Sequence, residues 1–275
     1  MSLTTLIPIL SVILMSLTPV TDLARISSPS LLLIPSYLTL NNYVWLFRGS
    51  TRLLDAYGIT IARLISGTAL CLLLTVITAY PLSKKYLPGR DKIMMLFFFT
   101  MLFSGGMIPT YLVVNTLGLT DTFLALILPC ALSVYNMILM RTYFQGLPEE
   151  LDESARIDGA SDMTILFRII LPVSAPALAS IGLFYAVMHW NSFMDAVLYI
   201  RPRELWPLQL LMREILSTNS AQELSLGGLV EDPLRPSTTL IINVVIVVSA
   251  LPIMCVYPFI QKYFVKGLMV GAIKG

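Results

Sequence analysis

The stretch GITIARLISGTALCLLLTVITAY, residues 58–80, is an apolar run in which Arg63 is the only charged residue. A helix needs about 20 mainly apolar residues to cross the hydrocarbon core of a bilayer, and this run is long enough. Similar runs predict further spans at about residues 3–20, 92–114, 122–140, 172–190 and 239–260. The sequence therefore predicts an all-α fold, a polytopic membrane helix bundle with about six transmembrane helices.

The composition also indicates that the chain lies in a bilayer. Hydrophobic residues form 56% of the 275 residues and charged residues 12%, and the mean hydropathy is +0.81. Soluble domains carry about 25% charge, so a bilayer is the natural environment of this chain. Six spans with their loops account for the length, and we expect a single membrane domain over residues 1–275. The net charge of +2 gives no argument for a nucleic-acid partner, and we expect none.

The orientation follows from the placement of lysine. If the amino terminus is cytoplasmic, all six lysines and 10 of the 18 basic residues face the cytoplasm, as the positive-inside rule requires. The arginines alone decide little, because eight of them fall outside. Residues 3–20 have no basic residue before them and no cleavage motif after them, so we interpret them as an uncleaved first span. We expect a multi-pass protein with both termini in the cytoplasm.

The third predicted span contains a break of its own. Ser104-Gly105-Gly106 and Pro109 would free backbone groups that lipid cannot satisfy, so this part must pack in protein or line a wet cavity. We expect a kinked or unwound helix there.

Residues 147–160, LPEELDESARIDGA, belong to a polar segment on the predicted cytoplasmic side. Pro148 suits the first position of a helix, and the acids that follow oppose the positive end of the helix dipole. Gly159 permits the left-handed turn that ends this helix. Ser161 then caps a second helix, which Pro172 separates from the fifth span. We expect a helix-glycine-helix in the cytoplasm.

This helix-glycine-helix, about residues 142–171, carries small side chains on its exposed corner and apolar ones on its second helix. The small ones are Ser154, Ala155, Gly159 and Ala160, and the apolar ones are Met163, Leu166, Phe167 and Ile170. So small a knob fits a cleft in another protein, where burying Phe167 and an aliphatic neighbour would contribute about 1.5–3 kcal/mol each. On composition alone, an ordinary amphipathic surface helix is the alternative.

The octapeptide Glu153-Ser154-Ala155-Arg156-Ile157-Asp158-Gly159-Ala160, followed by Phe167, Leu171 and Pro172, resembles the EAA loop of ABC importer permeases. Ser154 stands where alanine is commoner, which is a small-for-small change. The resemblance covers about residues 78–275 and includes the motifs Ala79-Tyr80-Pro81-Leu82, Ser104-Gly105-Gly106-Met107-Ile108-Pro109-Thr110-Tyr111 and His189-Trp190-Asn191-Ser192. These motifs are similar to the carbohydrate-uptake branch, the maltose and oligosaccharide type, and in particular to permeases that work with binding lipoproteins for complex oligosaccharides.

The resemblance implies a permease subunit that forms half of the translocation pathway for a sugar or oligosaccharide in the cell membrane of a bacterium. The implied partners are cytoplasmic ATPase subunits, a second permease that is a different chain, and an extracytoplasmic solute-binding protein. ATP and Mg would belong to the ATPase, so this chain would bind no cofactor. The implied ATPase-coupling residues are Glu153, Ser154, Ala155, Asp158, Gly159, Ala160, Phe167, Leu171 and Pro172. The tail, residues 261–275, would also approach the ATPase.

The common catalytic motifs are missing from the sequence. It contains no G-x-x-x-x-G-K-[ST] for phosphate binding and no G-x-S-x-G elbow. A single histidine, His189, excludes an HExxH pair, and the cysteines lie in separate apolar runs without metal-ligand spacing. We expect no enzyme activity and no metal site, with Cys71, Cys130 and Cys255 as buried, inert thiols.

Two other functions stay open at this point. An ion-coupled secondary carrier would keep acidic residues inside its spans, and this sequence holds almost none there. A membrane scaffold or sensor subunit is the second alternative, because a docking loop shows only that a partner is engaged.

Polar residues inside the predicted spans are candidates for contact with substrate. The end of the fifth span places aromatic faces beside hydrogen-bonding groups, which suits sugars, although interfacial anchoring and hydrogen bonding between helices are the alternatives. For Arg63, about one turn into its span, we expect snorkelling to the outer interface, with substrate contact as the alternative. The candidate pathway residues are Tyr135, Asn136, His189, Trp190, Asn191 and Asn243.

Overall fold

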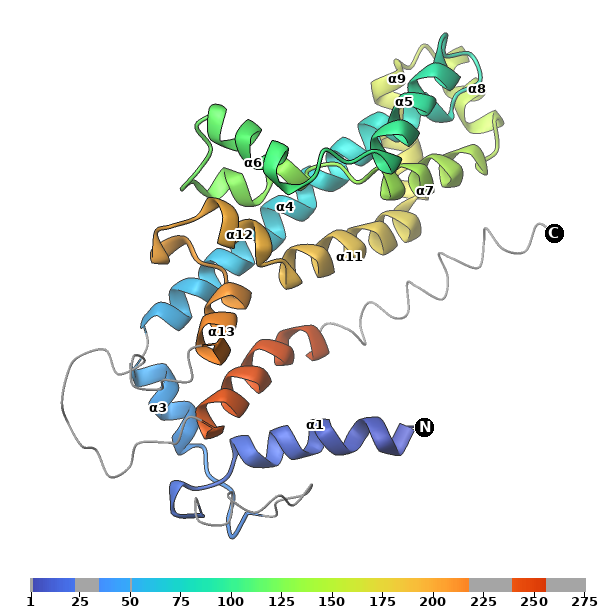
Figure 1. The fold of residues 1–275 in the computed structure, drawn as a ribbon. Coiled ribbons are helices and arrows are strands. Elements are labelled where there is room, and N and C mark those ends of the chain that lie inside the picture. The colour runs from blue at the N-terminus through green and yellow to red at the C-terminus, as the bar shows by residue number, and fades with distance from the viewer. Residues whose placement is uncertain (1, 23–34, 50, 218–238, 256–275) are drawn as a thin grey trace. The chain divides into compact units, whose positions relative to one another are not determined.

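The computed structural model describes residues 2–22, 35–49, 51–217 and 239–255, and every regular element in these ranges is helical (Figure 1). This confirms the all-α prediction. The chain forms two compact units, one made of Met1–Thr60 with Pro202–Val256 and the other built on Ile61–Arg201. The single domain stays a prediction, and the tail at residues 261–275 lies outside the described residues.

The first unit brings together segments from both halves of the sequence. Asn42 donates from Nδ2 to the backbone oxygen of Thr18 at 2.8 Å, and Thr60 Oγ1 accepts from the backbone nitrogen of Leu208 at 2.8 Å. The elements of this unit are α1 (Ser2–Ser16), η1 (Val20–Asp22), α3 (Asn41–Gly49), the start of α4 (Thr51–Ser83), η5 (Arg203–Leu205), α13 (Leu208–Ser217) and the apolar helix Thr239–Cys255.

The second unit contains residues 142–171, for which the sequence predicts coupling to an ATPase and which are called the coupling loop below. Its buried core gathers apolar side chains from α4 and from the helices around the coupling loop. The elements are the rest of α4, then α5 (Arg90–Leu102), α6 (Met107–Thr116), η2 (Phe123–Leu126), η3 (Leu128–Cys130), α7 (Val134–Gln145), α8 (Glu150–Ile157), α9 (Asp162–Ile165), the π-helix η4 (Leu166–Ile170), α10 (Leu171–Val173), α11 (Ala175–Asn191) and α12 (Met194–Tyr199).

Among the described residues, α4 alone is a single helix long and apolar enough to cross a bilayer. Three bent pairs would raise the number to four if each pair is one span: α5 with α6, η2 and η3 with α7, and α9 to α10 with α11. Two shorter apolar helices, Leu6–Ser16 and Thr239–Cys255, lie where the first and sixth spans were expected. The count of six therefore stays a prediction.

The break expected in the third span is present. Helix α5 ends at Leu102, α6 begins at Met107, and the two helices meet at 111°. Gly106 has a φ of +84°, which glycine adopts without steric cost. Pro109 lies in the first turn of α6, where its missing amide hydrogen removes no helical bond, so the break is made by residues 103–106.

Helices α4 and α11 pack closely because small residues face large ones. A Cβ on Gly67 would lie 2.5 Å from Nε2 of His189, so only glycine fits there. Further along α4, the hydroxyls of Thr75 and Tyr185 lie 2.7 Å apart and are both buried. These contacts join α4 to α11 at two places along the second unit.

Candidate functional site

The coupling loop folds as a helix-glycine-helix. Helix α8 ends after Ile157, and Gly159 follows with a φ of +78°, as the sequence predicted. Ser161 Oγ accepts a hydrogen bond from the backbone nitrogen of Thr164 at 3.3 Å and so caps α9, also as predicted. The prediction that Pro148 is the first residue of this helix was wrong. Helix α8 begins at Glu150, and Glu149 is its N-cap residue.

The prediction that Pro172 separates the second helix from the fifth span was also wrong. The chain continues from α9 through η4 into α10, and Pro172 lies inside α10 near its start, where a proline is tolerated. The direction changes by 85° at Ser174, between Asp162–Val173 and Ala175–Asn191. Helix α11, which lies where the fifth span was expected, therefore begins three residues later than predicted.

The exposed surface of the coupling loop differs in part from the expected one. Glu153, Ser154, Asp158 and Gly159 are exposed, whereas Ala155 is buried in the core and Ala160 is half-buried. In the second helix Met163 and Phe167 are exposed, but Leu166 and Ile170 are buried. Ala155 points inward because the inner face of α8 packs against the apolar core of the second unit. Leu171 is half-buried and Pro172 is exposed.

The inner face of α8 is tied to the end of α4. Asp152 accepts a hydrogen bond from the Tyr80 hydroxyl at 3.0 Å through Oδ1, and its Oδ2 forms an ion pair with Lys84. The Lys84 ammonium also lies 4.5 Å from the centroid of the Tyr80 ring. Burial lowers the pKa of Lys84 from its ordinary value, and the positive charge of Arg156 adds to this effect.

A cleft of about 620 Å³ opens beside this contact. Its lining mixes both signs of charge, and the outermost ion pair joins Lys85 Nζ to Glu149 Oε1 at 2.7 Å. The hydrogen bond from Lys85 holds the pKa of Glu149 below its usual range. The cleft is lined on one side by the segment between α4 and α5 and on the other by α8.

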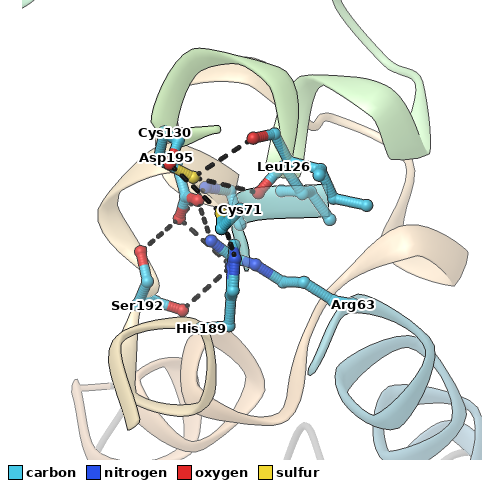
Figure 2. A network of polar contacts seen from close by, with 9 residues as sticks. Arg63, Cys71, Leu126, Cys130, His189, Ser192 and Asp195 are labelled. Atoms are coloured by element: carbon cyan, nitrogen blue, oxygen red, sulfur yellow. Dashed lines mark hydrogen bonds and ion pairs between the residues drawn. The ribbon is translucent and has the colours of Figure 1, made fainter. Parts of the chain in front are cut away.

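A second polar cluster lies on α4, α11 and α12 (Figure 2). The guanidinium of Arg63 pairs with Asp195, and its Nη1 donates to the backbone oxygen of Ser192 at 3.2 Å. Ser192 Oγ donates to Asp195 Oδ1 at 2.8 Å. The expected snorkelling of Arg63 was wrong, because its side chain is 0% exposed. Its charge is neutralised inside the protein instead of at the membrane surface.

Cys71 of α4 and His189 of α11 extend the cluster (Figure 2). Cys71 Sγ lies 3.5 Å from Nε2 of His189 and 3.5 Å from the backbone oxygen of Cys130. Cys71 is buried as expected, Cys130 is half-buried, and Cys255 is exposed, so the expectation of burial was wrong for Cys255. No group of three metal-ligating side chains occurs within the described ranges.

The candidate pathway residues differ in exposure and belong to both units. His189 and Trp190 are buried in α11, Asn136 is buried in α7, and Tyr135 and Asn191 are exposed. Asn243 belongs to the first unit, where its Nδ2 donates to the backbone oxygen of Thr239 in its own helix at 2.7 Å. Tyr135 and Asn191 are therefore the members of the set that lie open to a ligand within the second unit.

Sequence reasoning missed three residues of the coupling region. Ile157 is 86% exposed on α8. Helical spacing could have predicted this exposure, because Leu151 and Ala155 are four residues apart and share the inner face of the helix, whereas Ile157 lies off that face. The pairing of Lys84 with Asp152 had no local signal, because 68 residues separate the two.

Residues 5–270 match the family described as "Binding-protein-dependent transport system inner membrane component". The chain is 43% identical over 252 residues to the polygalacturonan/rhamnogalacturonan transport system permease protein YtcP of Bacillus subtilis, covering 91% of this chain and 87% of that protein. It is 44% identical over 273 residues to Protein LplC of the same organism, covering 98% and 90%.

A solved structure is similar over nearly the whole length. It is a crystal structure of a bacterial ABC transporter involved in the import of the acidic polysaccharide alginate, and one of its chains matches with a TM-score of 0.85 at 30% identity. The match covers 96% of this chain and 92% of that chain.

Proposed function

Since the chain belongs to the family of binding-protein-dependent transport system inner membrane components, we propose that it couples ATP hydrolysis on separate subunits to the import of an acidic oligosaccharide. It is a permease subunit of an ABC sugar importer and contributes part of the translocation pathway. Cytoplasmic ATPase subunits, a second permease and an extracytoplasmic solute-binding protein complete the proposed transporter.

The exposed apolar side chains of the coupling loop carry this proposal. Ile157, Met163 and Phe167 are exposed on either side of the turn at Gly159. Exposed apolar residues beside a polar rim mark an interaction site, and the predicted orientation places this one in the cytoplasm. We propose that these three residues enter a groove of the ATPase, and that Glu153, Ser154, Asp158 and Gly159 form the rim of the contact.

The proposed mechanism is a lever. Closure of the ATPase subunits around ATP displaces the coupling loop, and the helices attached to it tilt to open the pathway toward the binding protein. The left-handed turn at Gly159 sets the angle between α8 and α9 and so positions both halves of the docking surface together.

The acidic substrate is inferred from two relatives and one property of this chain. Polygalacturonan and alginate, named for the relatives above, are both polymers of uronic acids. Residues 58–80 and 175–191, in α4 and α11, contain no aspartate or glutamate, and the carboxylate of Asp195 beside them is neutralised by Arg63. An anionic sugar passing these helices would therefore meet little repulsion.

The test is uptake by the whole transporter. This chain, purified with the subunits that accompany it, is reconstituted in proteoliposomes with its binding protein outside and ATP inside. We expect ATP-dependent uptake of a galacturonic acid trimer and little uptake of maltotriose at the same concentration. Preference for maltotriose would contradict the acidic substrate, and ATP-independent uptake would contradict the coupling.

A further inference from the structure

Asp152 joins the coupling loop to a helix that the lever described above does not include. Its two carboxylate oxygens bind two different groups of α4 and its end, the hydroxyl of Tyr80 at 3.0 Å and the ammonium of Lys84. The side chains of Lys84 and Asp152 are only 14% and 16% exposed. The neighbouring pair of Lys85 and Glu149 is 80% and 72% exposed, so solvent and salt screen it far more.

This contact is fixed from several sides. The Lys84 ammonium lies over the Tyr80 ring at 4.5 Å, and that ring meets Phe144 of α7 edge-on with centroids 5.9 Å apart. On the other side of the α4 end, Arg141 Nε of α7 donates to the backbone oxygen of Leu82 at 2.8 Å. The end of α4 is thus held to α7 and α8 at once.

The direct route along the chain from α8 to α11 is less rigid. It passes the left-handed turn at Gly159, the π-helix η4 and the 85° bend at Ser174. Each of these is a departure from α-helical geometry where a displacement can be absorbed. Helix α4 is continuous from Ile61 to Ser83 within the second unit, with Pro81 in its last turn, and contacts α11 through Gly67 and Thr75.

We propose that Asp152 is a positioning residue that makes α8 and α4 move together, so that displacement of the coupling loop reaches the transmembrane helices through α4. This inference rests on the proposed function. Without the carboxylate, α8 remains docked on the ATPase and hydrolysis continues, but α4 no longer follows it. The result is ATP hydrolysis with little transport.

Two adjacent lysines provide a matched comparison. Lys84→Gln and Asp152→Asn each remove the half-buried pair, whereas Lys85→Gln removes only the exposed one. Uptake and ATP hydrolysis are measured in the same proteoliposomes that contain the whole transporter. We expect Lys84→Gln and Asp152→Asn to carry about tenfold less substrate per ATP, within the range of typical coupling effects, and Lys85→Gln to match the wild type.

Further variants separate coupling from folding. The double variant Lys84→Gln/Asp152→Asn should lose no more than either single variant, because both act on one contact. Lys84→Arg keeps a cation at this position and should retain most of the wild-type transport per ATP. If the charge variants fail to assemble, Tyr80→Phe, which removes one hydroxyl only, should still lower the ratio several-fold.

The outcomes distinguish the two levels of the proposal. A wild-type transporter without ATP-dependent uptake would overturn the proposed function and this inference with it. A coupled wild type, with unchanged transport per ATP in Lys84→Gln or in Tyr80→Phe, would overturn the role of Asp152 alone.

Discussion

Asp195 of α12 holds the guanidinium of Arg63 of α4, and the Arg63 side chain is completely buried. The same guanidinium binds the backbone oxygen of Ser192, in the short break between α11 and α12. One buried arginine thus binds both a helix end and a carboxylate within the protein.

Loss of the Asp195 charge should destabilise the protein. Asp195→Asn leaves Arg63 buried without a counter-ion, which typically costs about 3–5 kcal/mol. We expect a clearly lower melting temperature of the purified complex in detergent, which is measured by size-exclusion chromatography after heating. The matched control is Asp121→Asn, because the Arg201 side chain of its pair is 86% exposed and a pair of this kind contributes about 0–1 kcal/mol. Equal melting temperatures for the two variants would contradict this role of Asp195.

The turn at Gly159 should tolerate asparagine better than valine. Gly159 has a φ of +78° and open space where a Cβ would lie, so a substitution suffers from backbone strain and not from a clash. A residue other than glycine loses about 1–2 kcal/mol in this conformation, and asparagine loses least. We expect Gly159→Val to abolish uptake and weaken retention of the ATPase during purification, while Gly159→Asn keeps much of both. Membrane insertion should be normal in each variant, and equal uptake would refute the argument.

Ile157 should contribute to ATPase binding through its apolar surface. Burying an isoleucine in a partner groove is worth about 1.5–3 kcal/mol, or about 10- to 150-fold in affinity. We expect Ile157→Asp to remove most of the ATPase that co-purifies with the wild type, and Ile157→Val to remove little. Quantitative immunoblots of both subunits give the ratio. Full retention with Ile157→Asp would mean that the ATPase binds another surface.

The contact of Gly67 with His189 should be intolerant of one methyl group. A Cβ on Gly67 would lie 2.5 Å from Nε2 of His189, so the ring or the helix must move. Such overpacking typically costs about 1–3 kcal/mol, and we expect a lower melting temperature for Gly67→Ala. Gly58→Ala, also in α4 but with open space around it, is the control.

A compensating change tests the cause of that effect. In the double variant Gly67→Ala/His189→Ala, the space left by the imidazole accommodates the methyl group. Gly67→Ala should therefore cost less in the His189→Ala background than in the wild type. An equal cost in both backgrounds would show that helix packing elsewhere, and not His189, responds to the methyl group.

Local features of the coupling loop were predictable from neighbouring residues. The left-handed turn at Gly159 and the cap at Ser161 each depend on a few adjacent positions, and the structure has both. The errors arose where packing decides. Ala155 lies inward because α8 rests on the core, and the helical segment continues through Pro172 and changes direction only at Ser174.

The sequence by itself determined that the chain is helical and apolar, that a short helix within residues 147–160 ends before Gly159, and which family's motifs it carries. These properties depend on composition and short-range spacing, which are visible along the chain. Only the tertiary structure decided the partners of the buried charges: 132 residues separate Arg63 from Asp195, and 68 separate Lys84 from Asp152. A charge in an apolar interior must be paired, but which residue pairs with it depends on which helices pack together.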